Sequence, residues 1–283
     1  MKLHHWMILP VLTAAVMLGG CGTNPVTGKK QFLLISRDQE IAMGEEAAPE
    51  FEKEFDGEVP NQELQQYVGS VGAKLAAVSE RPMPYEYTLV ASDVPNAFAL
   101  PGGKIFITAG LMSRMSNERE LAAVLGHETA HVAAMHNVQG MLRQMGSAVL
   151  VQVAGIIVGA DKQKAAEAAA KVVGAMANLK YSRNDEYEGD KYGILYMTRA
   201  GYNPYGMVEL LTTLKNLSDT EGGTLTEMFQ THPLTSKRIE EAQQTIETGS
   251  ETKKFSPKAP DPYAARFLRM RRVLEGEMAK GAK

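Results

Sequence analysis

The sequence predicts a mostly helical domain of the α+β class with one small antiparallel sheet. Apolar residues recur at helical spacing among charged ones over residues 37–55 and 62–78, as in amphipathic helices. Over residues 85–90 and again over Lys104–Thr108, aromatic or branched residues alternate with polar ones, which is typical of strands. The turn at residues 101–103 precedes the second strand, so we expect the two strands to pair antiparallel.

The helices that follow the sheet are predicted from caps and periodicity. Asn117 is expected to be the N-cap of a helix, with Glu120 as its capping-box partner. Further helices are expected over residues 181–199, 205–217, 236–248 and 263–278. The apolar run at 148–160 is shorter than the roughly 20 residues that span a bilayer. We therefore expect a buried helix there, with a membrane-dipping helix as the alternative.

The N-terminal segment has the composition of a secretory signal. Lys2 precedes an apolar run that ends in small residues before Cys21, although an N-terminal anchor helix is the alternative. Residues 18–21, Leu-Gly-Gly-Cys, resemble the lipobox of bacterial lipoproteins, in which the signal is removed and the cysteine carries lipid. We therefore expect a lipoprotein signal peptide at residues 1–20 and a flexible, turn-rich tether at residues 21–31.

The compartment follows from the same segment and from the cysteine count. Cys21 is the one cysteine of the chain, so no internal disulfide can form. We expect a periplasm-facing lipoprotein of the bacterial cell envelope, attached to the membrane through lipid on Cys21. By resemblance to lipoprotein sorting, Gly22 after the cysteine favours the outer membrane. The net charge of −3 and the absence of a long basic run argue against a nucleic-acid partner.

The strongest chemical signal is the sequence His-Glu-Thr-Ala-His at residues 127–131, an HExxH motif on a predicted helix. Residues four apart share a helix face, so the imidazoles of His127 and His131 can bind one zinc ion. Glu128 lies beside them, where it can act as the general base on a water that the zinc activates. The motif predicts a zinc-dependent peptidase with a zincin-like catalytic domain, in which the small sheet packs beside the HExxH helix.

The third protein ligand is left open by spacing alone. His136 would lie on the opposite side of a continuous helix at nine residues from His127, which makes it a poor ligand. Glu186 and Asp190 are four apart, so the first could bind the metal while the second holds a ligand histidine. A solvated, acidic first helical turn explains the same two carboxylates.

The motif series resembles peptidase family forty-eight of the metallopeptidases, a family that includes the CAAX prenyl proteases, and in particular its secreted lipoprotein members. Four motifs occur in the family's order: residues 96–103 (NAFALPGG), HETAH with His136 behind it, the SRxxE run that ends at Asp190, and Thr-His-Pro at 231–233 with Arg238. Gly189 departs from the family's usual alanine.

The resemblance implies the roles of the site residues. One zinc ion would be bound by His127, His131 and Glu186, in the gluzincin pattern, with Glu128 as base and Asp190 outside the ligands. His232 would approach the open metal position, either stabilising the oxyanion or blocking water in a resting state. Arg238 could position His232 or a carboxylate, and a plain salt bridge explains it equally well. The substrate would lie as an added strand along Asn96, Ala97, Phe98 and Ala99.

Two functions follow as hypotheses. The first is a zinc endopeptidase that hydrolyses unfolded or misassembled envelope proteins, with residues 32–250 as the metallopeptidase domain and residues 251–283 as a C-terminal helical extension. The second is a periplasmic chaperone or assembly factor whose zinc is structural or latched. A structural zinc normally has four protein ligands, so His232 is the residue that separates the two hypotheses.

Overall fold

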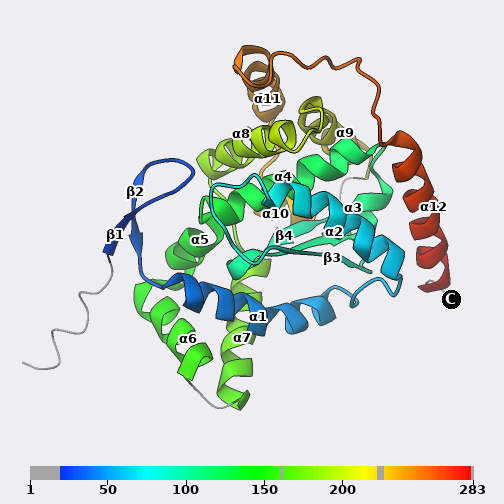
Figure 1. Cartoon of the computed structure of the whole chain (residues 1–283). Coiled ribbons are helices and arrows are strands. Elements are labelled where there is room, and N and C mark those ends of the chain that lie inside the picture. The colour runs from blue at the N-terminus through cyan, green and yellow to red at the C-terminus, as the bar shows by residue number, and fades with distance from the viewer. Residues whose placement is uncertain (1–19, 160–161, 222–225, 282–283) are drawn as a thin grey trace, which may run out of the picture.

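The computed structural model describes residues 20–159, 162–221 and 226–281, so the signal peptide expected at residues 1–20 lies almost wholly outside the described residues. Helices surround one small sheet (Figure 1), which confirms the predicted α+β class. The sheet has the order β3 (Glu86–Val90), β5 (Lys104–Thr108), β4 (Ala97–Ala99).

The pairing of the sheet differs in part from the expectation. β4 and β5 are antiparallel, but β3 runs parallel to β5, so the antiparallel pairing expected of residues 85–90 with Lys104–Thr108 is wrong. The cause is the turn Pro101–Gly103, which reverses the chain between β4 and β5 and leaves β5 between the other two strands. Gly102 has φ 77° in this turn, a left-handed conformation that glycine adopts without strain.

Alternating residues of the sheet divide the interior into two cores. Ile105 and Ile107 pack with residues of α4 (Glu118–Ala133) and α2 (Gln62–Ala76), whereas Phe106 between them packs with Phe51 of α1 (Arg37–Glu54). Successive side chains of a strand point to opposite faces, so a strand with both faces covered is buried throughout. All five residues of β5 are buried accordingly.

The HExxH motif lies on α4, and every residue of α4 except Arg119 is buried. The Asn117 side chain accepts a hydrogen bond from the Glu120 N–H, which confirms the predicted N-cap. The Glu120 carboxylate accepts from the Ser116 backbone N–H and from the Asn117 side-chain amide, rather than from the Asn117 backbone N–H that a capping box would use. α8 (Arg183–Arg199) packs along α4, so Glu186 and Asp190 of α8 lie against the HExxH motif.

The segment expected to be a flexible tether is a hairpin instead. β1 (Gly20–Thr23) and β2 (Lys30–Leu33) pair antiparallel, with Cys21 opposite Phe32. The buried Asn24 explains the difference, because its amide donates to the Ala134 carbonyl oxygen at 2.7 Å just beyond α4. Its Oδ1 also accepts from two backbone N–H groups of the hairpin loop. A buried amide with these partners fixes the segment on the domain.

Three helices continue from the motif helix: α5 (His136–Met145), α6 (Ser147–Gly159) and α7 (Lys162–Ala177). The buried helix expected at residues 148–160 is only partly buried, because Leu150, Val153 and Ala154 face inward while Val149 and Val158 are exposed. Among the described residues, no single helix is long and apolar enough to cross a bilayer. α5 and α6 meet that length and composition test only as a pair bent by 116°.

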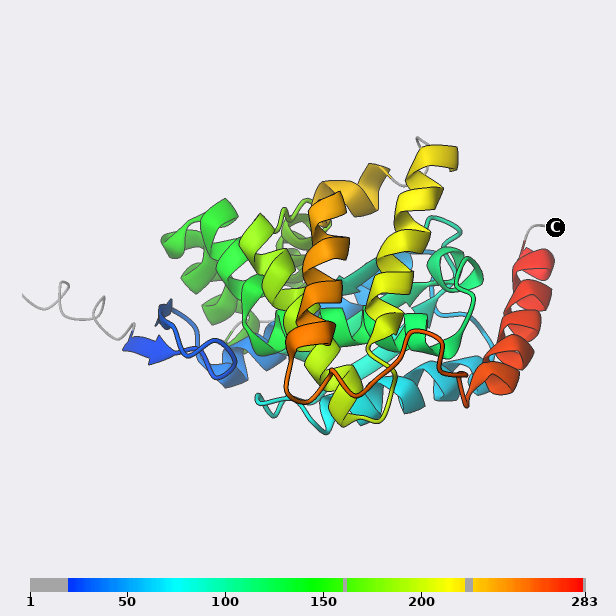
Figure 2. The same cartoon turned by 90° about the horizontal axis from the view of Figure 1, so that it is seen from above.

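The remaining helices are α3 (Ala109–Ser113), α9 (Tyr205–Glu221), α10 (Thr226–Thr231), α11 (Ser236–Thr248) and α12 (Ala264–Gly281). Of these, α9 packs on the motif helix, α11 packs on α9 and α8, and α12 packs mainly on α3 and α2. Phe267, Met270 and Leu274 of α12 belong to the same core as β5, so this stretch packs on the domain. The N-terminal hairpin and α12 lie at opposite ends of the molecule (Figures 1 and 2).

Candidate metal centre

The second half of α4 places three chemical groups on one side of the helix. His127, Glu128 and His131 are all buried, and the Nε2 atoms of the two histidines are 2.9 Å apart. Residues four apart on a helix lie one above the other, which explains why the two imidazoles converge. Burial lowers the pKa of His131 well below its usual value, so its imidazole is neutral, the form that binds zinc.

Glu186 reaches the same point from α8. Ser182 caps α8 with a reciprocal capping box to Asp185, which fixes where the helix starts and so directs the next residue inward. The fully buried Glu186 carboxylate lies 3.5 Å from His131 Nε2 and 3.7 Å from His127 Nε2. The structure thus brings the expected ligands together. Glu186 is not the solvent-exposed carboxylate of a first helical turn that the alternative interpretation required.

His232, directly after α10, completes the cluster. Its Nδ1 lies 3.0 Å from Glu186 Oε1 and 3.4 Å from His127 Nε2. One donor atom from each of His127, His131, Glu186 and His232 lies within 4.8 Å of the others. Ligand atoms about 2.0–2.2 Å from a tetrahedral zinc ion are roughly 3.3 Å apart, so these four residues fit the ion.

Asp190 and Arg238 surround the cluster. Asp190 Oδ1 lies 3.0 Å from His127 Nδ1, the ring atom that does not face the other ligands. The Arg238 guanidinium donates to both Asp190 oxygens at 2.8 and 2.7 Å, and its Nη1 lies 2.5 Å from Glu186. Burial alone would raise the pKa of Asp190, but Arg238 lowers it below the usual value. Arg238 therefore binds the two carboxylates and is no surface salt bridge.

Glu128 is the group that the cluster leaves free. Its Oε2 is buried and has no hydrogen-bond partner among the described residues, and its Oε1 lies 3.8 Å from His232 Nε2. Burial raises the pKa of Glu128, while the neighbouring His232 and His127 lower it less. A buried carboxylate oxygen without a partner costs stability, and a catalytic role is one explanation for such a group in a folded protein. Proton transfer beside the metal is the function that this position offers.

Comparison with known proteins decides the family. A model of Peptidase family M48 matches residues 60–246, more than half of the 283 residues and a range that includes every residue of the cluster. The chain belongs to peptidase family M48. Its members are metallopeptidases, which agrees with the His and Glu cluster.

Individual relatives are proteases by name. The chain is 31% identical over 228 residues to the beta-barrel assembly-enhancing protease of Yersinia pestis, covering 77% of this chain and 46% of that protein. It is 28% identical over 225 residues to the mitochondrial metalloendopeptidase OMA1 of Schizosaccharomyces pombe, covering 78% of this chain and 65% of that protein. The Escherichia coli beta-barrel assembly-enhancing protease is 28% identical over 255 residues, which cover 83% of this chain and 51% of that protein. The chain spans about half the length of these bacterial relatives.

In this M48 chain, His136 has a role that helical spacing concealed. α4 ends before Met135, which adopts φ 60°, and α5 begins at His136. His127 and His136 are therefore not on one continuous helix. His136 Nδ1 lies 3.1 Å from His131 Nδ1, and its Nε2 lies 3.1 Å from Glu188. His136 is outside the ligand cluster, as expected, but it contacts a ligand. The helix break that causes this carries no glycine or proline that would reveal it.

Glu188 extends this contact to the N-terminal hairpin. Lys29 of the hairpin loop pairs with the Glu188 carboxylate. The hydrogen bond with His136, together with this pair, lowers the pKa of Glu188 to about 2 although burial opposes the shift. A chain of polar contacts thus runs from the hairpin through Glu188 and His136 to His131. Sequence analysis missed Glu188 because its partners lie 52 and 159 residues away.

Tyr181 is a second buried neighbour that the sequence analysis did not identify. Its ring centroid is 4.0 Å from that of His131 and 4.9 Å from that of His232. Its hydroxyl is buried without a hydrogen-bond partner among the described residues, and burial raises its pKa well above the usual value. Tyr181 therefore stays neutral and covers one side of the M48 cluster with an aromatic ring.

The expected substrate strand lies at the edge of the sheet. β4 pairs with β5 on one side and is the outer strand of the sheet formed by the described residues. The side chains of Asn96, Ala97, Phe98 and Ala99 are all buried, so only the backbone of this strand could pair with another chain. The Ala97 N–H is already bonded to the Asn96 side chain.

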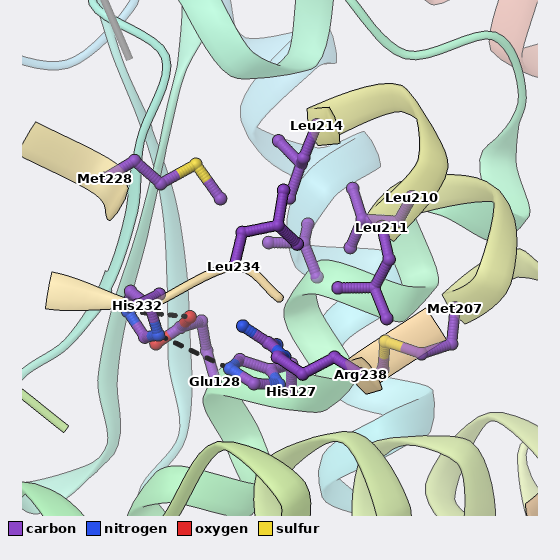
Figure 3. Close-up of a pocket in the computed structure, with 11 residues that line it drawn as sticks. His127, Glu128, Met207, Leu210, Leu211, Leu214, Met228, His232, Leu234 and Arg238 are labelled. Atoms are coloured by element: carbon purple, nitrogen blue, oxygen red, sulfur yellow. Dashed lines mark hydrogen bonds and ion pairs between the residues drawn. The ribbon is translucent and has the colours of Figure 1, made fainter. Parts of the chain in front are cut away.

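An apolar hollow adjoins Glu128. Figure 3 shows Met207, Leu210, Leu211 and Leu214 from α9 facing it, with Met228 and Leu234 beside His232. Its free volume is about 20 Å³, space for about one water molecule. The M48 site therefore has an apolar hollow next to the Glu128 carboxylate, and this hollow is nearly closed in the present conformation.

Proposed function

We propose that the chain is a zinc-dependent endopeptidase of the gluzincin type that hydrolyses unfolded or misassembled envelope proteins. The observation that carries the proposal is the buried cluster of His127, His131 and Glu186 beside an unpartnered Glu128 oxygen. These three residues would hold one zinc ion. When bound, the ion supplies a Lewis acid and lowers the pKa of a coordinated water toward neutrality.

Glu128 performs the proton transfers of this reaction. Its free oxygen takes a proton from the attacking water and passes it to the leaving amine. Asp190 keeps the His127 ring in place through Nδ1, and Arg238 keeps Asp190 and Glu186 in place. No serine, cysteine or threonine nucleophile is needed.

We infer that His232 holds the site in a resting arrangement. Its Nδ1 lies among the metal-ligand atoms, and the adjoining hollow is nearly closed. For catalysis His232 would move aside, after which its ring could stabilise the oxyanion. The hollow would then accept an apolar side chain of a substrate that pairs with β4 as an added strand.

The proposed location is the bacterial envelope. Relatives of this chain are named beta-barrel assembly-enhancing proteases, which supports envelope proteins as substrates. Lipid on Cys21 would hold the chain at the membrane, facing the periplasm, with the outer membrane favoured by Gly22. The alternative of a chaperone or assembly factor is not favoured, because these relatives are each named as a protease.

The test is casein degradation by the purified full chain. Wild type is measured as isolated, after chelation, and after stoichiometric zinc is returned, beside zinc-loaded Glu128→Gln. We expect activity that chelation abolishes and zinc restores, and none in Glu128→Gln. Equal activity of wild type and variant would reject the mechanism. If both are inactive with zinc bound, His232→Ala tests the resting arrangement: activity above that of wild type would support it, and inactivity of that variant as well would reject it as the cause.

A further inference from the structure

α6 presents an apolar face that the domain does not cover. Val149, Val151 and Val158 are 40%, 45% and 61% exposed, on a helix that contains no charged residue. Leu150, Val153 and Ala154 on its other side are buried against the rest of the domain. Scattered apolar residues are normal on a protein surface, but the whole exposed side of α6 is uncharged, so no charge opposes its contact with an apolar medium.

The N-terminal hairpin adds an aromatic residue to this side of the molecule. Phe32 is 60% exposed, and its carbonyl oxygen accepts a hydrogen bond from the Gln139 side chain of α5 at 2.9 Å. A hollow of about 250 Å³ lies between the hairpin and the helices, and Phe32, Leu33, Leu142 and Leu150 border it. In both overall views, the hairpin and α6 lie at the same end of the molecule, away from α12 (Figures 1 and 2).

We propose that Phe32, this hollow and the exposed face of α6 together form a membrane-docking surface that enters the boundary between headgroups and acyl chains. We take the partner of this surface to be a lipid bilayer because lysines lie beside its apolar residues. Lys29 and Lys30 precede Phe32 in the hairpin, and Lys162 and Lys164 lie in the first turn of α7, all of them exposed. Apolar side chains bordered by lysines match a surface whose headgroups are anionic and whose interior is apolar.

The hairpin register supplies an independent reason, which rests on the lipid anchor in the proposed function. Cys21 is directly opposite Phe32 in the antiparallel pair. The backbone register places the residue that would carry lipid at the same position along the hairpin as Phe32, so the lipid would bring this end of the molecule to the bilayer.

Depth-dependent fluorescence quenching tests the surface in the full chain. Trp6 is the one tryptophan, so Trp6→Phe gives a background without signal. Val151→Trp is compared in this background with Leu268→Trp, because Leu268 is equally exposed at 45% but lies on α12 at the other end. Each variant is reconstituted with vesicles of phosphatidylethanolamine and phosphatidylglycerol, with or without bromine on the acyl chains.

We expect brominated lipid to reduce the fluorescence of Val151→Trp by about twofold or more, and to leave Leu268→Trp unchanged, since the quencher lies within the hydrocarbon. Val149→Ser with Val158→Ser in the Val151→Trp chain should lower the quenching. Absence of quenching at residue 151 overturns the proposal, as does equal quenching at residue 268. A residue 151 signal that shifts with protein concentration and without lipid means that a second copy covers the face.

The lipid anchor is measured separately, by the mass of the N-terminal peptide. Quenching without lipid on Cys21 supports the surface and removes only the argument from the hairpin register. Lipid on Cys21 without quenching overturns the surface and leaves the anchor in place. Casein degradation tests the peptidase without reference to either result.

Discussion

The two ends of α4 bury carboxylates in opposite ways. At the N-terminal end, Glu118 is fully buried and accepts hydrogen bonds from the Tyr67 and Tyr202 hydroxyls at 3.0 and 3.1 Å. Arg266 donates two more, at 2.9 and 3.1 Å. At the C-terminal end, Glu128 is equally buried, but its Oε2 has no partner among the described residues.

The difference separates a structural carboxylate from a reactive one. Four donors satisfy Glu118, so its charge contributes to stability and is not available for chemistry. Glu128 is held in the same helix with an unused acceptor near the imidazoles of His232 and His127, where the missing contact costs stability. Sequence shows the same residue type in both places, and the hydrogen-bond partners decide which of the two is functional.

The largest expected effect is on activity. Glu128→Gln should reduce casein degradation by about 10³-fold or more, because general-base catalysis contributes roughly 10²–10⁴-fold and an amide cannot take the proton. The temperature of unfolding should stay the same or rise, since a charge without partners is removed. A large fall in that temperature would show that Glu128 stabilises the fold as Glu118 does, and the contrast between the two carboxylates would then be wrong.

The second effect is on stability. Glu118→Gln should lower the free energy of unfolding by about 2–3 kcal/mol, because Arg266 and two tyrosine hydroxyls lose a charged acceptor, with Arg266 partly exposed to solvent. Denaturant unfolding measures it. The matched control is Glu63→Gln, whose exposed pair with Arg269 should contribute less than about 1 kcal/mol. Activity per folded molecule should be unchanged in both variants.

The third effect is on metal affinity. Asp190→Asn should weaken zinc binding by about 10–100-fold, because the His127 ring loses the charged partner at Nδ1. Competition with a coloured chelator measures this without reference to activity. Asp219→Asn, an exposed carboxylate on α9, serves as the control and should bind zinc like wild type. Unchanged affinity in Asp190→Asn would mean that Asp190 serves Arg238 alone.

The smallest effect tests the contacts outside the ligands. Glu188→Gln should weaken zinc binding by about two- to threefold, because Glu188 reaches His131 only through His136. Lys29→Met should change the affinity less than Glu188→Gln, since exposed ion pairs contribute about 0–1 kcal/mol. If Lys29→Met has the larger effect, the hairpin itself positions the ligand, and the same titration shows it.

Much of the helical framework could be predicted from local signals. α1, α2 and α4 begin at their predicted starts and α8 begins two residues later than predicted, because caps such as Asn117 act within a few residues. The parallel pairing of β3 with β5 could not be predicted in this way, because the pattern of a strand does not state its neighbour. The exposure of α6 was missed because an apolar run shows hydrophobicity but not what covers it.

The sequence by itself determined the helix that carries His127, Glu128 and His131, because the spacing of four residues fixes a shared face wherever the helix lies. It also offered Glu186, Asp190 and Arg238, without deciding between ligand and solvated charge. Only the tertiary structure decided that question, since the packing of α8 against α4 sets the distances between their side chains. The tertiary structure also decided that one Glu128 oxygen has no hydrogen-bond partner among the described residues while Glu118 has several, because such partners come from segments far apart in the chain.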